Sequence, residues 1–473
     1  MKNDIYKTHL LLKNKKVSSL ELVTEAVKNA KNSKCNTFIS LTEETALIEA
    51  EKCDKEKIFN NPLMGIPYTL KDLFITEGVR TTAGSKILFN YNPPYDGYVS
   101  SALKKAGSIL VGKVSCDEFG MGSTNENSAF GPVKNPLDLN KVPGGSSGGS
   151  SASILEGSSF FSMGTDTGGS ARLPANFCGI VGFKPSYGRV SRFGQIAYAS
   201  SLDQASPMGK SVLDIACVME HLTSPDPKDA TNAKLPPMKI VHDLLSLKSG
   251  SLKNKKIGFC PEFISACDKE VAASLNDALH LFRKNGASVV EVSLPSVKNC
   301  VPAYYVIATS EASSNLSRYD GIHFGFRKSH QGNLEDTYCE SRTFGFGEEV
   351  KKRIMLGTFS LSSGYYDAYY IKACKVRRLI ANDFNEAFKS CDVVFSPVCA
   401  TSAFNLGAMN SDPMQMYMND LYTIPVNLAG LPAIALPFGQ SQGMPTGFQL
   451  IGQAFKDEDL LMIAGGFEQN FSR

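Results

Sequence analysis

Some segments of the chain are short apolar runs typical of strands, and others have apolar residues at the spacing of a helix. Together they predict strands separated by helices. Short apolar runs bounded by turn residues predict strands at 64–75, 107–114, 159–166, 256–260, 288–294, 392–397, 433–439 and 446–452. Apolar residues at helical spacing predict helices that open at Ser18 and that cover 211–222, 270–284 and 365–388. Ser18 and Glu21 fit a capping box at the start of the first of these helices. Strands that alternate with helices indicate an α/β fold, with helices on both faces of a sheet.

Two stretches show neither pattern. Residues 118–151 are mostly turn residues, with a few Phe, Met and Val side chains among them. A long loop inside a compact protein is usually functional or disordered, and the apolar side chains argue against disorder. Residues 223–238 are rich in proline and polar residues and fit either an interdomain linker or a surface loop, of which we favour the loop. No internal repeat is found.

Composition narrows the class of protein. The 473 residues are 42% hydrophobic and 20% charged, which is ordinary for a globular protein of two or three domains or of one large α/β unit. A net charge of +3 argues against a strongly basic nucleic-acid surface, although a local patch stays possible. The 12 cysteines form no C-x-x-C pair, which argues against a zinc ribbon or a thioredoxin-type motif and fits a reducing compartment. The N-terminal apolar run at 10–12 is too short for a signal peptide, and no apolar run predicts a membrane span.

One stretch matches the sequence motif of a phosphate-binding loop only in part. "GSILVGKV" at 107–114 has the spacing of the loop, but Val114 stands where a Mg²⁺-binding hydroxyl is needed. Its middle residues are of the types found in a core strand. We therefore expect Lys113 to be a lysine near the end of a strand.

Another stretch matches the G-x-S-x-G pattern of serine hydrolases. "GSSGG" at 145–149 would make Ser147 the nucleophile, but a turn precedes it instead of a strand. The following "SSASILEG" is short, although it could begin a helix. A serine–histidine triad would also need one of the histidines, none of which has a site-like context: His9, His221, His242, His280, His323 and His330.

A different serine has a better setting. In "GTDTGGSARLPA" at 164–175, two glycines precede Ser170 and leave the backbone open to close approach. A serine needs a base to become a nucleophile, and a lysine can serve when burial lowers its pKa. Lys71 ends a predicted buried strand, where an unpaired ammonium would be costly. Hydroxyls of "PGGSSGGSS" at 143–151 could pass the proton from Ser170 to Lys71.

These segments resemble the amidase signature family over the chain from about residue 60 to its end. The resemblance is carried by "GIPYTLKD", "PGGSSGGSS", "GTDTGGSARLPANFCGIVGFKPSYGRVSRFG" and "LPAIALPFGQ" followed by "GMPTGFQLIG". It implies a large mixed β-sheet covered by helices on both faces, with a helical insert on the substrate side. It also implies one domain over 1–473, with a helical N-terminal segment at about 1–60, a core at about 61–300 and 390–473, and the insert at about 300–390.

The resemblance implies a Ser–cis-Ser–Lys triad, with Ser170 as nucleophile, Ser146 as bridging serine in a cis peptide and Lys71 as base. It also implies an oxyanion hole made by the backbone N–H groups of Thr167, Gly168, Gly169 and Ser170. The sequence departs from the family pattern near the nucleophile at Thr165, Ala171 and Leu173. We expect no loss of activity from these departures.

Within the family the chain is most similar to the A subunits of glutamyl-tRNA(Gln) amidotransferases. "SRYDGIHFGFR", the segment at 347–380 and "MYMNDLYTIPVNLAGLPAIALP" carry this similarity. It implies a glutaminase in which Arg353 binds the α-carboxylate of glutamine, Asp420 binds its ammonium and Tyr304 adds a hydroxyl, with Tyr305 not excluded. Without the resemblance, Arg353 and Asp420 would be taken for members of surface ion pairs.

The same similarity implies partners. Ammonia would travel through a tunnel to the B subunit of a heterotrimer, which would carry Glu-tRNA(Gln), ATP and Mg²⁺, while a small C subunit would wrap the interface. This chain itself would bind no cofactor, metal or membrane, and would work in the cytoplasm or, in a eukaryote, in an organelle matrix. The alternatives are a stand-alone amidase that uses the same triad on a small or acyl amide, and a non-enzymatic scaffold. The presence of Lys71, Ser146 and Ser170 argues against the scaffold.

Overall fold

Strands from both halves of the chain form one mixed β-sheet. The computed structural model describes residues 4–56, 58–248, 250–328, 332–408 and 419–471. Within these ranges the sheet has eleven strands in the order β1-β3-β2-β4-β6-β5-β10-β11-β9-β7-β8. The strands are β1 (Phe38–Leu41), β2 (Pro67–Lys71), β3 (Ile109–Val114), β4 (Phe161–Asp166), β5 (Val181–Lys184), β6 (Gln204–Gly209), β7 (Lys256–Phe259), β8 (Ser288–Glu291), β9 (Val393–Pro397), β10 (Ala433–Ser441) and β11 (Met444–Ile451). Strand β2 lies parallel to β3 and β4, and β7 lies parallel to β8 and β9.

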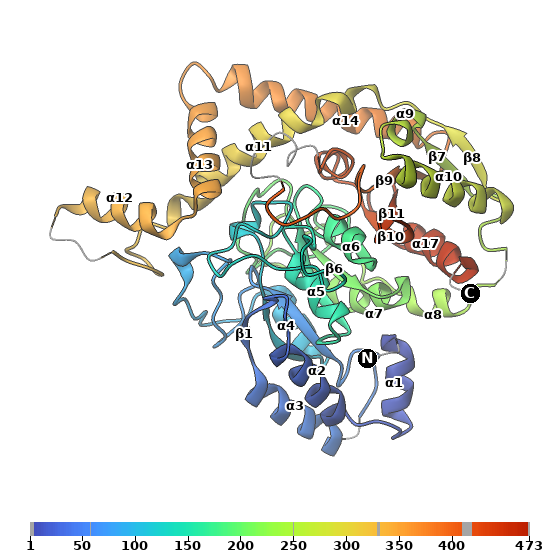
Figure 1. Cartoon of the computed structure of the whole chain (residues 1–473), viewed down its shortest axis with the longest axis horizontal. Coiled ribbons are helices and arrows are strands. Elements are labelled where there is room, and N and C mark those ends of the chain that lie inside the picture. Colours follow the sequence, from blue (N-terminus) through green and yellow to red (C-terminus); the bar gives the residue numbers. More distant parts are fainter. Residues whose placement is uncertain (1–3, 57, 249, 329–331, 409–418, 472–473) are drawn as a thin grey trace.

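Helices surround this sheet (Figure 1). The first group is α1 (Ile5–Lys13), α2 (Ser19–Lys31), α3 (Glu43–Glu56), α4 (Tyr98–Lys105), α5 (Gly148–Leu155), α6 (Arg172–Cys178), α7 (Val212–Leu222), α8 (Val241–Leu245), α9 (Pro261–Ser265) and α10 (Lys269–Lys284). The second group is α11 (Cys300–Asn315), α12 (Leu334–Gly345), α13 (Glu348–Leu361), α14 (Lys372–Ala387), α16 (Ile424–Leu428) and α17 (Asp457–Phe471). Short turns are η1 (Lys86–Leu88), η2 (Glu118–Gly120), η3 (Pro295–Asn299), η4 (Leu316–Arg318) and the π-helical η5 (Asp367–Ile371).

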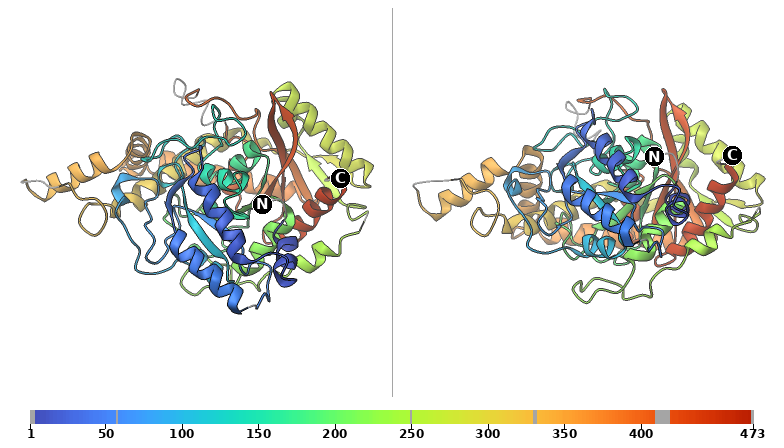
Figure 2. Two further views of the ribbon diagram at one scale, coloured as in Figure 1. Left: turned by 60° about the horizontal axis from the view of Figure 1, so that its bottom comes forward. Right: turned by 90° about the horizontal axis from the view of Figure 1, so that it is seen from below.

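The sheet is buried on both faces, as the sequence predicts. Successive side chains of a strand point to opposite faces, so β10 shows what covers each one. Ile434 and Leu436 belong to the apolar cluster that includes residues of α7, α10 and α17. Ala433 and Ala435 belong to clusters that include residues of α11, α16 and α6. Figure 2 shows helices on either side of the strands.

Every predicted strand forms, and the capping box at Ser18 and Glu21 is present at the start of α2. The predicted helices at 211–222 and 270–284 are α7 and α10. The helix expected over 365–388 begins with the π-helical turn η5 and continues as α14. The stretch 223–238 contains neither helix nor strand, in agreement with a surface loop.

Three strands were not predicted, namely β1, β5 and β6. The clearest case is β6, "QASPMG", which contains Pro207 and no β-branched residue. Proline usually avoids central strands because it lacks an N–H group. Here β6 lies between β4 and β5, with Pro207 opposite Met163 of β4. Tertiary pairing therefore overrides the local propensity.

The segment at about 300–390 is helical and includes α11 to α14. Helix α12 extends away from the body of the molecule, at the left of Figure 1. The loop at 118–151 is largely irregular, but it contains η2 and the start of α5. These two segments supply much of the site described next.

Candidate active site

Lys71 is the last residue of β2 and is fully buried. Tyr68 and Leu70 pack into the apolar cluster of α7, α10 and α17, so Lys71 points to the opposite face. There its Nζ lies 2.7 Å from Ser146 Oγ, 2.9 Å from Ser147 Oγ and 2.8 Å from Thr165 Oγ1. The amine therefore contacts three hydroxyl groups. Within the described residues, it forms no ion pair with a carboxylate.

Burial lowers the pKa of Lys71 to about 8, because the charged ammonium loses its hydration. The carboxylates of Asp117, Asp166 and Asp203 oppose this shift in part. A neutral amine has two N–H donors and one lone pair, which matches its three hydroxyl contacts. The Ser147 hydroxyl donates to the Thr165 carbonyl at 3.1 Å, so its proton is already used. The lone pair of Lys71 is thus left to the hydroxyl of Ser146 or Thr165.

Ser146 follows a cis peptide bond from Gly145, as the family resemblance implies. The loop is fixed by backbone bonds on both sides: Asp117 N–H donates to the Ser146 carbonyl at 3.3 Å, and Gly145 N–H donates to the Ser123 carbonyl at 2.7 Å. The next residue, Ser147, donates its N–H to the Ser170 carbonyl at 3.1 Å. The structure therefore brings the loop of Ser146 against the backbone of Ser170.

The Ser170 side chain differs from the other serines of the site. The residue is 8% exposed, whereas Ser146 and Ser147 are fully buried. Its hydroxyl makes no hydrogen bond with any residue in the described ranges. Ser170 is thus the serine that a ligand can reach, and its hydroxyl is free to bind one.

The loop before Ser170 is held by Asp166, the last residue of β4. The Asp166 carboxylate accepts hydrogen bonds from the backbone N–H groups of Gly169 at 2.9 Å and Ala171 at 3.3 Å. Gly169 has a φ of +137°, and a Cβ on it would lie 2.2 Å from Thr423 Oγ1. Only glycine fits this position.

This arrangement changes the predicted oxyanion hole. Because the Gly169 N–H already donates to Asp166, it is not available to a ligand. The backbone N–H groups of Thr167, Gly168 and Ser170 make no hydrogen bond with the described protein. Those three remain as candidate donors.

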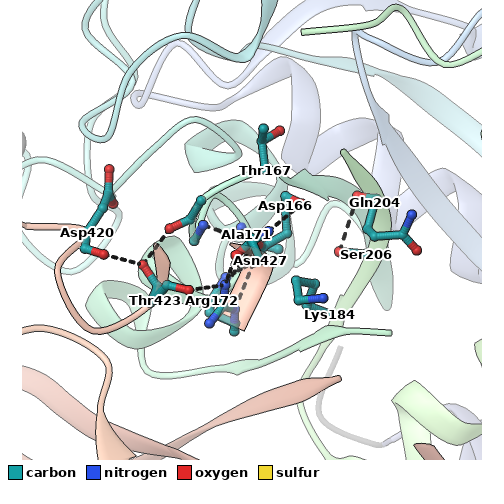
Figure 3. A network of polar contacts seen from close by, with 12 residues as sticks. Asp166, Thr167, Ala171, Arg172, Lys184, Gln204, Ser206, Asp420, Thr423 and Asn427 are labelled. Atoms are coloured by element: carbon teal, nitrogen blue, oxygen red, sulfur yellow. Dashed lines mark hydrogen bonds and ion pairs between the residues drawn. The ribbon is translucent and has the colours of Figure 1, made fainter. Parts of the chain in front are cut away.

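Asp166 is itself paired with Arg172, and both side chains are fully buried (Figure 3). Nε and Nη2 of Arg172 each lie 2.9 Å from a different oxygen of Asp166. Arg172 also donates to Asn427 at 2.6 Å and to Gln449 at 2.7 Å. Burial alone would raise the pKa of Asp166, but the charge of Arg172 and the hydrogen bonds bring it to about 2. The loop therefore rests on a carboxylate that is ionised at neutral pH.

Tyr304 of α11 lies over Gly168. A Cβ on Gly168 would approach the Tyr304 hydroxyl to 2.7 Å. The ring of Tyr305 instead lies 5.3 Å from the Arg353 guanidinium. Of the two tyrosines left open by the sequence, Tyr304 is the one beside the oxyanion loop.

Arg353 of α13 is buried, contrary to the idea of a surface ion pair. Its Nε donates to Glu349 at 2.8 Å, one turn earlier on the same helix, and its Nη1 donates to the Tyr198 hydroxyl at 2.7 Å. Nη2 makes no hydrogen bond with the described residues. The Nη2 side of the guanidinium is thus free to bind a ligand. The contacts of Arg353 with Glu349 and Tyr198 were not predicted from the sequence.

Asp420 is also buried and accepts a hydrogen bond from the Ser123 hydroxyl. Desolvation raises the pKa of Asp420 to about 7, although Ser123 and the charge of Arg353 act in the opposite direction. A cationic ligand would stabilise the ionised form of this buried carboxylate. Arg353 and Asp420 therefore offer one positive and one negative group within electrostatic reach of each other.

The competing motifs are not supported by the structure. A helix follows Ser147, but the described histidines form no hydrogen bond with Ser147 or Ser170, and His330 lies outside the described residues. Lys113 lies in β3 and forms a fully buried pair with Asp72 at 3.2 Å, with no resemblance to a phosphate loop.

Sequence reasoning missed the roles of Thr165, Asp166, Arg172 and Thr423, and it named Ser147 only as a formal nucleophile and as one of several relay hydroxyls. Thr165 was treated as a neutral departure, yet it contacts the amine of Lys71 directly. The described ranges hold no group of His, Cys, Asp or Glu side chains suited to a metal ion. On length and hydropathy, their helices also include none that could cross a bilayer.

Comparison with known proteins gives consistent results. The Amidase family profile matches residues 21–461. A curated A subunit of glutamyl-tRNA(Gln) amidotransferase from Vesicomyosocius okutanii is 50% identical over 460 residues, which cover 97% of this chain and 95% of that protein. The protein of that name from Geobacillus kaustophilus is 48% identical over 473 residues, covering 99% and 97%.

Two solved structures extend the comparison. The A subunit of glutamyl-tRNA(Gln) amidotransferase from Thermotoga maritima is 38% identical, with a TM-score of 0.80 over 99% of this chain and 95% of that one. The native peptide amidase from Stenotrophomonas maltophilia is 26% identical, with a TM-score of 0.85 over 100% of this chain and 97% of that one.

Proposed function

This chain belongs to the amidase family, and on that premise we propose that it is the glutamine-hydrolysing A subunit of a glutamyl-tRNA(Gln) amidotransferase. The observation that carries the proposal is the fully buried amine of Lys71, 2.7 Å from Ser146 Oγ, in a loop bonded to the backbone of Ser170. We also propose that residues 1–473 form one domain, as the family resemblance implies.

In the first half-reaction Ser170 Oγ attacks the side-chain amide carbon of glutamine. Its proton passes to Ser146, whose own proton passes to the lone pair of Lys71. The tetrahedral intermediate then collapses, the carbon–nitrogen bond breaks, and the proton returns through Ser146 to the leaving ammonia. A glutamyl ester on Ser170 remains. Water attacks this ester by the same proton route and releases glutamate.

The negative oxygen of the intermediate would be bound by the backbone N–H groups of Thr167, Gly168 and Ser170. One such donor contributes about 2.7–4 kcal/mol to lowering a barrier of this kind. The glycine at 168 supports the assignment, because the absence of a side chain leaves the amides open to an approaching oxygen.

The zwitterionic end of glutamine would lie between Arg353 and Asp420. The free edge of the guanidinium would bind the α-carboxylate and Asp420 would bind the ammonium. Tyr304 would add its hydroxyl beside Gly168. The opposite charges of Arg353 and Asp420 favour a glutaminase. The second candidate is a stand-alone amidase that acts on a small or acyl amide, because the chain is also similar to a peptide amidase.

The released ammonia would pass to a B subunit, where ATP and Mg²⁺ would activate the glutamyl group of Glu-tRNA(Gln), with a C subunit completing the heterotrimer. An exposed apolar surface on the insert supports a protein partner. It consists of Met355, Leu356, Phe359, Tyr365, Tyr366 and Tyr369. We place the complex in the cytoplasm or, in a eukaryote, in an organelle matrix.

The test uses the purified chain, alone and co-expressed with the B and C subunits. Glutamine should yield equal amounts of glutamate and ammonia, and Ser170→Ala should lower the rate by about 10³-fold or more. The Ser317→Ala variant, far along the chain on η4, is the control and should keep the wild-type rate. Full activity of Ser170→Ala would remove the nucleophile. Indifference to glutamine with rapid hydrolysis of simple amides would favour the stand-alone amidase.

A further inference from the structure

Glu118 is a buried carboxylate between the core and the helical insert, and the mechanism above does not use it. It lies in η2 and is 4% exposed. One of its oxygens accepts a hydrogen bond from the Ser85 hydroxyl, and the other accepts from the Gly347 backbone N–H at 2.8 Å. Burial raises its pKa to about 7 despite these two donors. Burying a carboxylate costs free energy, so we asked what its two hydrogen bonds contribute to the structure.

Gly347 is the residue before α13, and it has no side chain to cap that helix. A Cβ at this position would lie 2.4 Å from Glu118 Oε2, so glycine leaves room for the incoming carboxylate. An acidic group at the first N–H groups of a helix satisfies an unpaired donor and interacts favourably with the helix dipole. Glu118 thus caps α13 from outside the helix.

Helix α13 carries Arg353, about two turns from the capped end. A helix is stiff over that distance, so a displacement of its first residue is passed on to the guanidinium, although α11 also holds the helix through Ser360 and Thr358. Arg353 in turn reaches across to Tyr198 of the core at 2.7 Å. The helix is therefore fixed to the core at two points, the Glu118 carboxylate and the Tyr198 hydroxyl.

The residues that follow Glu118 add to this connection. The ring of Phe119 packs against those of Tyr319 and Phe346, at centroid distances of 5.0 and 5.7 Å. Phe346 directly precedes Gly347. Four residues beyond Phe119, Ser123 donates its hydroxyl to Asp420. One short segment of the core, 118–123, therefore supports both charged groups assigned to the substrate.

We propose that Glu118 is a positioning residue for Arg353, and that its hydrogen bond to Gly347 fixes where the guanidinium meets the α-carboxylate of the substrate. This inference rests on the proposed function and deepens it by naming what sets its specificity. Glu118 itself touches no substrate. Its loss should therefore weaken recognition of the carboxylate while the triad keeps working.

The experiment compares two substrates in the co-expressed complex. Glutamine carries the α-carboxylate, and 4-aminobutanamide is the same molecule without it. For Glu118→Ala we expect KM for glutamine to rise about tenfold, the cost of one misplaced charge-assisted hydrogen bond, with kcat within about twofold. KM for 4-aminobutanamide should stay within about twofold of wild type, since that substrate does not use Arg353.

Three further variants make the result specific. Glu118→Gln keeps the chain length and an oxygen that can accept from Gly347, so it should restore KM to within about threefold of wild type. Gly347→Ala keeps the Glu118 side chain, but the added methyl group would displace its carboxylate from the Gly347 N–H. This variant should therefore behave like Glu118→Ala. The matched control is Glu220→Ala, since Glu220 accepts from the first N–H groups around α8 on the other side of the molecule (Figure 1). It should leave both KM values unchanged.

The outcomes separate the two proposals. A wild-type complex that does not hydrolyse glutamine contradicts the proposed function. A wild-type complex that does, with Glu118→Ala raising KM equally for both substrates or lowering kcat for both, contradicts the positioning role and indicates a general effect on the fold. Hydrogen exchange at the Gly347 amide, faster in Glu118→Ala and unchanged in Glu220→Ala, supports the contact independently of activity.

Discussion

The Ser123 hydroxyl donates a hydrogen bond to the Asp420 carboxylate across 297 positions of sequence. Ser123 belongs to the irregular loop after β3, and Asp420 lies just before α16. The contact opposes the effect of burial on the Asp420 pKa, since a hydrogen bond to the charged carboxylate favours that form. If Asp420 binds the substrate ammonium as proposed, that recognition depends on a serine far away in the chain.

We expect Ser123→Ala to raise KM for glutamine by about three- to tenfold, because a hydrogen bond to a charged group contributes about 1.5–3 kcal/mol, only part of which affects binding. The value of kcat should change little. Steady-state kinetics of the complex measure both. Ser265→Ala, which removes an exposed hydroxyl bonded within α9, is the control. A fall in kcat without a change in KM would contradict the assignment of Asp420 to ground-state binding.

The pH dependence follows from two groups that both act in their deprotonated form, although burial lowers the pKa of Lys71 and raises that of Asp420. Lys71, with a pKa of about 8, must be neutral to accept a proton, and Asp420, with a pKa of about 7, must be ionised to bind the ammonium. Both active forms gain population as the pH rises. The logarithm of kcat/KM should therefore rise with a slope of about two below pH 7 and about one between 7 and 8, and then level off.

A substrate without the α-amine separates these groups. With glutaramate, Asp420 has no partner, so the slope below pH 7 should fall to about one while the plateau near pH 8 remains. Initial rates between pH 5.5 and 9.5 on the same preparation, an interval of about four units around the two pKa values, give both profiles. A flat profile for glutamine from mildly acid to alkaline pH would exclude a lysine base.

Gly169→Ala should strongly lower activity. The added methyl group would approach Thr423 Oγ1 to 2.2 Å, at a φ of +137° that alanine rarely adopts. The loop would have to move, which displaces the neighbouring N–H groups and Ser170. We expect a loss of at least about 10²-fold in kcat, the effect of one lost oxyanion donor. Gly443→Ala, with a φ of +74° but open space around it, should keep the rate and shows what backbone strain alone does.

Arg172→Met should lower the free energy of unfolding by about 3–5 kcal/mol, because it leaves the buried charge of Asp166 unpaired. The double variant Asp166→Asn with Arg172→Met should recover part of this loss. Urea denaturation followed by circular dichroism measures both. Lys389→Met, which breaks an exposed pair with Glu386, should change stability by less than about 1 kcal/mol. Equal effects of the buried and exposed changes would contradict the supporting role of Arg172.

The same pair gives a prediction for acid stability. The pKa of Asp166 in the folded chain, about 2, lies below its ordinary value of 3.8. Its contribution to stability is therefore present above pH 4 and is lost as the pH falls through about 2. Asp166→Asn should flatten the fall of unfolding free energy over that interval.

The buried strand that ends at Lys71 could be predicted from sequence because apolar residues lead up to it. Thr165 could not be recognised as a partner, since its contact with Lys71 exists only because β2 and β4 lie side by side in the sheet. The same holds for Arg172, whose bonds to Asn427 and Gln449 come from the far end of the chain. Local patterns specify elements, whereas these roles come from pairing between distant elements.

The oxyanion loop shows the limit in another way. Four consecutive N–H groups look equivalent in the sequence, and the glycines suggest that all are open. Asp166 accepts from one of them, Gly169, and thereby shapes the loop that presents the others. Which donor supports the loop and which can serve a ligand depends on the direction of each N–H, and residue type alone does not reveal it.

Lys71, the proposed proton acceptor, lies on an inner strand of the sheet, while Arg353, the proposed ligand of the substrate carboxylate, lies on a helix outside the sheet. Under this proposal, bond cleavage and substrate choice depend on different elements of the fold, which share one apolar cluster. A descendant of this chain could exchange its outer helices, accept other amides, and inherit the cleavage machinery unchanged.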